Sequence, residues 1–324
     1  MKHADFTLEK IDEVMNIAAA SFSSYRKTAA QQRALFLETI GHEIEALGDA
    51  LILKASGETN LPAARLLSER GRTVMQLNMF AAMLRDGSWA ELTIDTTQPD
   101  RKPVPRRDIR KISVPIGIIV VFGASNFPFA YSTAGGDTAS ALAAGCPVVV
   151  KAHPAHAETS EMVAGAILKA AAKTNMPQGV FQHVFGASAE TGKALVQHPA
   201  TAAVGFTGSL AGGKALYDYA HERKIPIPVF SEMGSVNPVV FLPDTMEKNA
   251  DSLAKQYAAS ITTGMGQFCT KPGLLIAMET EALPAFVECL TRAIHEVEPA
   301  PMLHAGIQAQ YDSKLEKALT QPGV

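Results

Sequence analysis

The chain has 324 residues, a formal charge of -3 at neutral pH, and 47% hydrophobic against 19% charged residues. This length allows two domains with a substantial core, and the charge offers no basic excess to neutralise phosphates or anionic lipids. The composition therefore excludes the usual nucleic-acid-binding and membrane-surface proteins, and it favours an ordinary globular protein.

Cysteine usage and the N-terminus indicate the compartment. The three cysteines are an odd number and lie far apart, so we expect no disulfide framework. The N-terminus has no apolar stretch of the signal-peptide kind. The longest apolar run, residues 116–122, is too short to cross a bilayer and suits a buried strand. We therefore expect a cytoplasmic protein.

Residues 7–89 carry apolar side chains at helical spacing, which predicts an all-helical first layer. Asn60 and Pro62 resemble a cap followed by an early-turn proline that opens a further helix. Charges such as Glu43 are expected on a solvated face. Residues 90–111 are rich in Thr, Asp, Pro and Arg. They predict a hairpin or linker that contacts a neighbouring subunit, with anion binding by its arginines as the alternative.

After residue 111, strands and helices alternate. The expected strands are residues 112–122, 147–151, 180–184, 202–206 and 227–230, and the expected helices are residues 132–144, 158–173, 189–197 and 209–221. Near-continuous apolar strands alternating with helices predict an α/β fold with a Rossmann-like parallel sheet covered on both faces. Such sheets bind ligands at the carboxyl ends of their strands. We assign residues 1–235 to this helical layer and dinucleotide-binding domain.

A second unit follows at residues 236–324. It contains expected strands at residues 239–242 and 274–278 and expected helices at residues 247–263 and 283–297. Two strands rarely make a stable sheet alone. The sequence therefore predicts the start of an α/β domain that is incomplete.

Cys269 lies in the stretch GMGQFCT, after a helical segment. A thiol is a nucleophile only as thiolate, so it needs backbone N–H groups, a helix N-terminus or a base nearby. The two glycines let the backbone bend at this point. The alternative is that Cys269 is a small buried apolar residue. Cys146 and Cys289 are expected in the core.

Two further stretches suggest cofactor contacts. Gly205, Phe206, Gly208 and Ser209 lie in GFTGS, where a strand turns into a helix and glycines can let backbone amides approach a pyrophosphate. The spacing departs from G-x-G-x-x-G, so a plain tight turn is the alternative. Lys151 ends another strand and could meet a ribose hydroxyl or a phosphate, or it could be an ordinary surface lysine.

Asn126 follows the first strand of the sheet, and Glu232 follows another apolar strand. The Asn126 amide could donate to a developing oxyanion, or it could form a turn. The Glu232 carboxylate could activate water, or it could accept hydrogen bonds from a loop. His153 and His156 are disfavoured as metal ligands because Pro154 between them prevents a regular helix, and we expect no metal.

Together and in this order, these stretches resemble the aldehyde dehydrogenase superfamily along essentially the whole chain. ASNFPFA resembles its Asn-bearing turn, VVVKAHPAH its adenosine-binding lysine strand, and GFTGS its pyrophosphate turn. SEMGSVNP resembles its general-base motif, and GMGQFCT resembles its nucleophile motif. AGGDTASALAAGCPVVVKAHPAH and ETNLPAARLLSERGRT are most similar to the α-ketoglutarate semialdehyde (2,5-dioxopentanoate) and NADP-dependent fatty aldehyde dehydrogenases.

The resemblance implies a mechanism. The Cys269 thiolate attacks an aldehyde, the Asn126 amide and the Cys269 backbone N–H hold the oxyanion, hydride passes to the nicotinamide, and water activated by Glu232 hydrolyses the thioester. Lys151, Gly208 and Ser209, with Phe206 and Gly205 of the same turn, would hold NADP or NAD.

Two departures from the family pattern matter. Many NAD-preferring relatives carry a glutamate three residues after the strand lysine, where this chain has Pro154. Losing that carboxylate favours NADP use at least equal to NAD. Family members also run further, so we expect a truncated chain that lacks part of the substrate pocket and of the assembly strand. The resemblance implies a homo-oligomer for the longer form.

Other functions stay open. The main alternative is a catalytically impaired dinucleotide-binding or subunit-interaction module. Fatty aldehydes are a second substrate class, and transfer of the acyl group to coenzyme A is disfavoured by Glu232 at the water-activating position.

Overall fold

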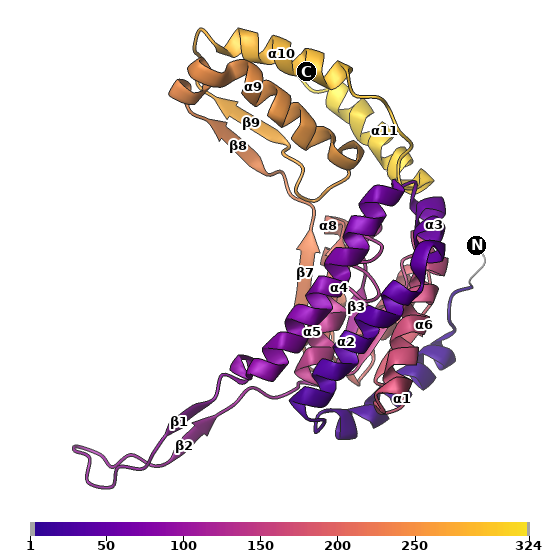
Figure 1. The fold of residues 1–324 in the computed structure, drawn as a ribbon, viewed down its shortest axis with the longest axis vertical. Coiled ribbons are helices and arrows are strands. Elements are labelled where there is room, and N and C mark those ends of the chain that lie inside the picture. Colours follow the sequence, from indigo (N-terminus) through magenta and orange to yellow (C-terminus); the bar gives the residue numbers. More distant parts are fainter. Residues whose placement is uncertain (1–3, 323–324) are drawn as a thin grey trace.

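The chain folds into two parts and a projecting hairpin (Figure 1), and this computed structural model describes residues 4–322. The larger part contains the N-terminal helices and a five-stranded sheet, and the smaller part contains a two-stranded sheet and the last helices. The α/β class with a parallel sheet, expected from the sequence, is confirmed.

Helices form the whole N-terminal layer, as the apolar spacing predicts. They are α1 (Leu8–Tyr25), α2 (Ala30–Ala46), α3 (Gly48–Thr59) and α4 (Ala63–Asp86). The Thr7 side chain caps α1 by accepting from the backbone N–H of Lys10. The buried Tyr25 hydroxyl donates to the carbonyl oxygen of Leu142 at 2.8 Å, which fixes α1 against the sheet domain.

Glu43 of α2 corrects one expectation, because it does not lie on a solvated face. Its side chain is 7% exposed, and Lys169 pairs with it at 2.6 Å while Lys173 donates to its other oxygen. Both lysines belong to α6 (Ala157–Lys173). The Glu43 carboxylate can be buried because the two lysine ammonium groups compensate its charge.

The larger sheet has the strand order β5-β4-β3-β6-β7, and all its pairings are parallel. Its strands are β3 (Ile118–Phe122), β4 (Val148–Lys151), β5 (Phe181–Val184), β6 (Thr201–Gly208) and β7 (Val229–Met233). The crossover helices are α5 (Gly136–Ala144), α6, α7 (Ala189–Gln197) and α8 (Leu210–His221). Val121 and Val150 pack into one core cluster, and Val120 and Val149 into the other. Both faces of the sheet are therefore covered.

The first strand is shorter than the expected residues 112–122. β3 begins at Ile118, directly after Gly117, whose φ is 138°. A Cβ at Gly117 would lie 2.6 Å from that of Ala202, so the backbone bends there and only glycine fits. The helix expected from residue 132 begins instead at Gly136.

The predicted hairpin is present as β1 (Thr93–Asp95) and β2 (Ile109–Lys111), which pair antiparallel. It projects from the body at the end opposite the smaller part (Figure 1). Arg106 pairs with Asp95 at 3.5 Å, and Arg110 pairs with Asp108 at 3.0 Å. The subunit contact expected of this hairpin stays a prediction.

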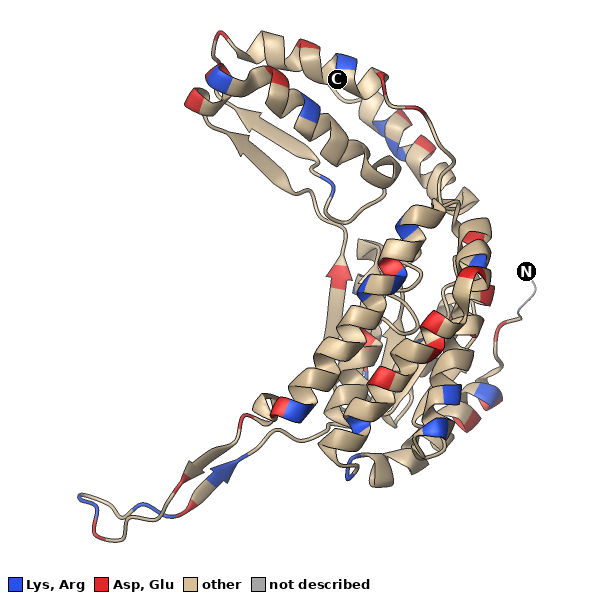
Figure 2. Cartoon of the chain, in the orientation of Figure 1, with Lys and Arg blue, Asp and Glu red and all other residues tan. Residues whose placement is uncertain are grey.

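The smaller part pairs β8 (Pro238–Phe241) and β9 (Leu274–Ala277) in parallel. Its helices are α9 (Pro243–Thr262), α10 (Leu283–His295) and α11 (Ala305–Leu319), and the last was not expected. Phe241, Met246 and Phe286 pack in its core. Val240 and Ile276 are exposed, and Figure 2 shows both strands without charged residues. One side of this sheet is thus apolar and open.

Within residues 4–322, no helix is both long and apolar enough to cross a membrane.

Candidate active site

The candidate cofactor residues end neighbouring strands at one edge of the larger sheet. Lys151 of β4 is in register with Phe122 of β3, which is in register with Phe206 of β6. Thr207 of β6 is in turn in register with Glu232 of β7. Adjacent strands lie about 4.8 Å apart, so these residues form one row at the carboxyl edge, where open parallel sheets bind ligands.

The strand-to-helix turn after β6 is built around the Phe206 ring. A Cβ at Gly208 would lie 2.6 Å from this ring and one at Gly212 would lie 3.0 Å from it. Ser209 caps α8, because its hydroxyl accepts from the backbone N–H of Gly212 at 3.1 Å. The glycines therefore make room for the ring, and Ser209 and Leu210 at the N-terminus of α8 are exposed. Such an end fits the pyrophosphate of a dinucleotide.

Lys151 is more constrained than a surface lysine. Its Nζ donates to the carbonyl oxygens of Gly186 at 2.7 Å and Ala152 at 3.1 Å. Burial lowers the pKa of Lys151 to about 8, and the nearby Asp5 carboxylate partly opposes this shift. An ammonium held in place at the carboxyl edge of the sheet fits a ribose hydroxyl or a phosphate.

The loop before Cys269 has an unusual backbone. Gly264, Met265 and Gly266 follow α9 with φ angles of 59°, 57° and 69°. A Cβ at Gly264 would lie 2.8 Å from the Phe268 ring, so glycine is required there for space as well as for conformation. Met265 adopts the left-handed conformation although it has a side chain, and this strains its backbone. The loop is thus specified by its glycines, as the sequence indicates.

Asn126 contacts the loop of residues 264–271, which contains Cys269 and is called the cysteine loop below. Its Nδ2 donates to the carbonyl oxygen of Gln267 at 2.8 Å, two residues before Cys269. A second asparagine, Asn237, donates its Nδ2 to the carbonyl oxygens of Cys269 at 2.7 Å and Lys271 at 3.1 Å. The structure therefore brings together the turn after β3, the segment before β8 and the cysteine loop.

The two reactive candidates are accessible. The Cys269 thiol is free and half-buried, and Glu232 is exposed on β7, an edge strand of its sheet. Within the described residues, neither side chain makes a hydrogen bond to the other. Glu232 lies five residues before Asn237, and that asparagine holds the Cys269 backbone.

The remaining cysteines and the histidine pair have other roles. Cys146 and Cys289 are buried, as expected, and Cys289 donates to Oδ1 of Asp251 at 3.0 Å. His156 is fully buried, and its Nε2 contacts the carbonyl oxygen of Ala124 at 2.9 Å. Its ring stacks on His153 with centroids 5.3 Å apart. No group of three or more candidate metal ligands occurs in residues 4–322.

Sequence reasoning missed Arg65 of α4. Its guanidinium lies 4.7 Å from the Phe127 ring centroid and 4.9 Å from that of Phe268. Its Nη2 donates to the carbonyl oxygen of Asn126 at 2.6 Å. The only sequence signal was its position in ETNLPAARLLSERGRT. Asn237 was missed as well, inside SEMGSVNP.

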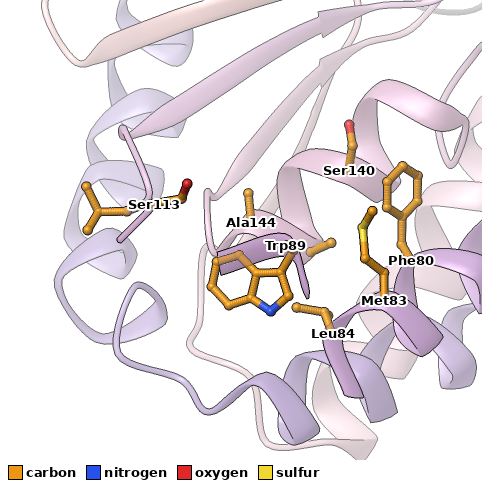
Figure 3. A pocket seen from close by; sticks show the side chains of 9 residues that line it. Phe80, Met83, Leu84, Trp89, Ser113, Ser140 and Ala144 are labelled. Carbon is orange, nitrogen blue, oxygen red and sulfur yellow. The ribbon is translucent and has the colours of Figure 1, made fainter. Parts of the chain in front are cut away.

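An apolar cavity of about 230 Å³ lies elsewhere, between α4, α5 and the segment after the hairpin (Figure 3). Phe80, Met83, Trp89 and Val114 are among its lining residues. None of the candidate site residues lines it. Its walls hold no titratable side chain, so it is suited to packing rather than to catalysis.

Comparison with known proteins gives a consistent assignment. The aldehyde dehydrogenase family model matches residues 1–309. The chain is 50% identical over 314 residues to an alpha-ketoglutaric semialdehyde dehydrogenase of Azospirillum brasilense and 45% identical over 317 residues to one of Acinetobacter baylyi. These alignments cover 97% and 98% of this chain, and the chain spans about 60% of the length of each relative.

Solved structures agree on the fold. A NAD-dependent benzaldehyde dehydrogenase of Corynebacterium glutamicum superimposes with a TM-score of 0.82 at 20% identity, over 98% of this chain and 68% of that protein. A NAD-dependent aldehyde dehydrogenase of Sinorhizobium meliloti gives 0.80 at 21% identity, over 98% and 61%. With the match of the family model, these findings show that the chain belongs to the aldehyde dehydrogenase family.

Proposed function

We propose that the chain belongs to an NAD(P)-dependent aldehyde dehydrogenase that oxidises 2,5-dioxopentanoate to 2-oxoglutarate. The observation that carries this proposal is the hydrogen bond of the Asn126 amide to the carbonyl oxygen of Gln267, two residues before the free Cys269, which supports Asn126 as the oxyanion donor. The two semialdehyde dehydrogenase relatives support the substrate. In this proposal residues 1–235 hold the cofactor, and residues 236–324 supply the nucleophile.

The chemistry assigns one role to each residue. The Cys269 thiolate attacks the aldehyde carbon, and the resulting oxyanion accepts hydrogen bonds from the Asn126 amide and the Cys269 backbone N–H. A nicotinamide cofactor, when bound, would supply the hydride acceptor. Glu232 takes a proton from water, whose oxygen attacks the Cys269 thioester and releases the acid and the thiol. Aldehyde, water and oxidised cofactor thus give acid, reduced cofactor and a proton.

Lys151 and the turn formed by Gly205, Phe206, Gly208 and Ser209 would hold the cofactor in this proposal. Pro154 is exposed where many NAD-preferring relatives carry a glutamate, and no carboxylate stands there to repel a 2′-phosphate. We therefore propose NADP use at least equal to NAD. A specificity constant for NAD well above that for NADP would overturn this choice.

The open side of the β8–β9 sheet favours a second candidate function. Val240, Leu274 and Ile276 are exposed there, and the chain spans about 60% of the length of its relatives. A two-stranded sheet with a bare apolar side is marginal alone. The second candidate is therefore a dinucleotide-binding or subunit-interaction module, in a homo-oligomer, with impaired catalysis.

Reduced-cofactor formation separates the two candidates. The purified chain and its Cys269→Ala variant are mixed with 2,5-dioxopentanoate and NADP, and fatty aldehydes are compared as competing substrates. Turnover that the variant loses supports the enzyme. Cofactor binding in calorimetry without turnover by either protein supports the module instead.

A further inference from the structure

Arg65 is a cation placed between the two segments that carry the candidate catalytic residues. Its guanidinium lies within 5 Å of the ring centroids of Phe127 and Phe268, which are 5.2 Å apart. Phe127 follows Asn126, and Phe268 precedes Cys269. The charge therefore lies against the sequence neighbours of both Asn126 and Cys269.

The Arg65 guanidinium has an N–H donor group that is not used in a hydrogen bond within the described residues. Nη2 donates to the carbonyl oxygen of Asn126, but Nη1 is buried and has no hydrogen-bond partner among the described residues. Within residues 4–322, the carboxylate paired with Arg65 is that of Glu69, whose Oε2 lies 3.7 Å from Nη2. One Glu69 oxygen already accepts from the backbone N–H groups of Phe129 and Ala130, at 2.8 and 3.0 Å.

The Glu69 carboxylate is shared by two arginines of α4. Arg72, two helical turns further along α4, also acts on Glu69, so two arginines face one carboxylate. Arg72 lies over a different ring, that of Tyr131, at 5.0 Å from its centroid. The β1–β2 hairpin, whose sequence includes Arg106 and Arg110, projects at the end of the molecule opposite the smaller part (Figure 1). Arg65 instead contacts the Phe268 ring of the cysteine loop.

A guanidinium with a free donor suits a carboxylate, because its planar fork matches two oxygens. A long alkyl chain would leave the same donor without a partner. The two rings beside it offer flat surfaces for the few carbons between an aldehyde and an acid group. These features favour a short, charged substrate over a fatty aldehyde.

We propose that Arg65 binds the carboxylate of a short oxo-acid semialdehyde while Cys269 attacks its aldehyde carbon. This inference rests on the proposed function and names the residue that selects its substrate. It assigns to one side chain the preference for 2,5-dioxopentanoate over uncharged aldehydes of equal length.

Substitution of Arg65 tests the inference through substrate preference. Arg65→Met is compared with Arg65→Lys and with Arg72→Met, a matched control that removes an arginine of the same helix stacked on a different ring. The value of kcat/KM is measured for 2,5-dioxopentanoate and for pentanal. Arg65→Met is expected to lose roughly 100-fold on the charged substrate and less than about 3-fold on pentanal. Arg65→Lys should keep part of the preference, and Arg72→Met most of it.

Equal losses on both aldehydes would overturn the proposal, because Arg65 would then only position Asn126 and Phe268. No loss on either would overturn it too.

A binding measurement keeps this inference separate from the proposed function. In the Cys269→Ala background, calorimetry with 2,5-dioxopentanoate needs no turnover. Binding that Arg65→Met weakens at least about tenfold and Arg72→Met does not would support the recognition even if the unmodified chain were inactive. Turnover by the unmodified chain with no effect of Arg65→Met would leave the proposed function standing and remove the inference. No binding at all would remove it as well.

Discussion

The side-chain amide of Asn126 donates to the carbonyl oxygen of Gln267 at 2.8 Å, across 141 positions of sequence. This bond joins the turn after β3 to the loop that carries Cys269. In a reaction the same amide would have to leave Gln267 and donate to the substrate oxyanion. In the proposed mechanism, the contact therefore holds the loop before substrate arrives and keeps the Asn126 amide on Gln267, which lies two residues before Cys269.

Replacement of Asn126 by Asp tests the proposed oxyanion role, and it also removes the hydrogen bond to Gln267. The change keeps the shape and removes the donor, so kcat is expected to fall about 10²- to 10³-fold. Cofactor affinity should stay within about threefold, because the cofactor residues lie on other strands. Steady-state kinetics and calorimetry check the two values. An unchanged kcat would show that another group holds the oxyanion.

Asn237 should stabilise the cysteine loop. Its φ is 48°, so glycine can replace it without backbone strain while removing both hydrogen bonds to the loop. Asn237→Gly is expected to lower the free energy of unfolding by about 1 to 3 kcal/mol, measured in urea. Asn175→Gly is the control, because Asn175 has a φ of 54°, is exposed and makes no side-chain hydrogen bond within the described residues. Equal changes in the free energy of unfolding for both variants would show that the Asn237 hydrogen bonds do not stabilise the cysteine loop.

Lys151 predicts a pH dependence of cofactor binding. Its pKa is lowered to about 8, so the ammonium loses its proton as the pH rises through that value. Affinity for NADP should then decrease between about pH 7 and 9, and Lys151→Met should abolish the dependence while weakening binding. Calorimetry across this range measures both. A flat profile for the unmodified chain would show that Lys151 does not contact the cofactor.

The same shift has a consequence for stability. The folded-state pKa is below the ordinary value of 10.5, so the unfolded chain binds more protons between these values. The penalty of the buried ammonium is fully present below about pH 8, and stability should increase as the pH rises above it. Lys151→Met should remove this increase in urea unfolding. An increase of the same size in the variant would assign it to another group.

Gly208 should not tolerate replacement by alanine, whereas a glycine in an exposed helix should. The Phe206 ring is confined by Gly208, Gly212 and Gly213, so the added methyl of Gly208→Ala has little room. We expect a loss of about 1 to 3 kcal/mol in the free energy of unfolding and weaker cofactor binding. Gly57→Ala in α3, where nothing lies within 4 Å of the new Cβ, should instead stabilise by about 0.5 to 1 kcal/mol. Changes of the same sign in both variants would contradict this account of the turn.

Strand and helix periodicity predicted most of the fold because its elements are buried in regular patterns. The helix expected at residues 189–197 has those bounds, and all five strands of the larger sheet were expected, with errors at their ends. α11 was not expected because it buries none of its residues, so no apolar period marks it. The prediction that Glu43 is solvent-exposed was wrong, because the two lysines that pair with it lie 126 and 130 positions further along the chain.

The residues of the candidate site also differ in whether the sequence could predict them. Asn126, Lys151, Glu232 and Cys269 stand in short motifs at strand ends or loops, where residue type and position indicate chemistry. Arg65 stands in a helix, and its contacts with Asn126 and Phe268 are set by the packing of distant segments. Their roles in catalysis stay predictions.

The most direct test of the cysteine mechanism is mass spectrometry of the Glu232→Gln chain after incubation with 2,5-dioxopentanoate and NADP. Without the base for water, the account predicts that a thioester accumulates on the peptide that contains Cys269, and that Cys269→Ala in the same background abolishes it. An acyl group on Cys146 or Cys289, or cofactor reduction without any acylated Cys269, would contradict the account.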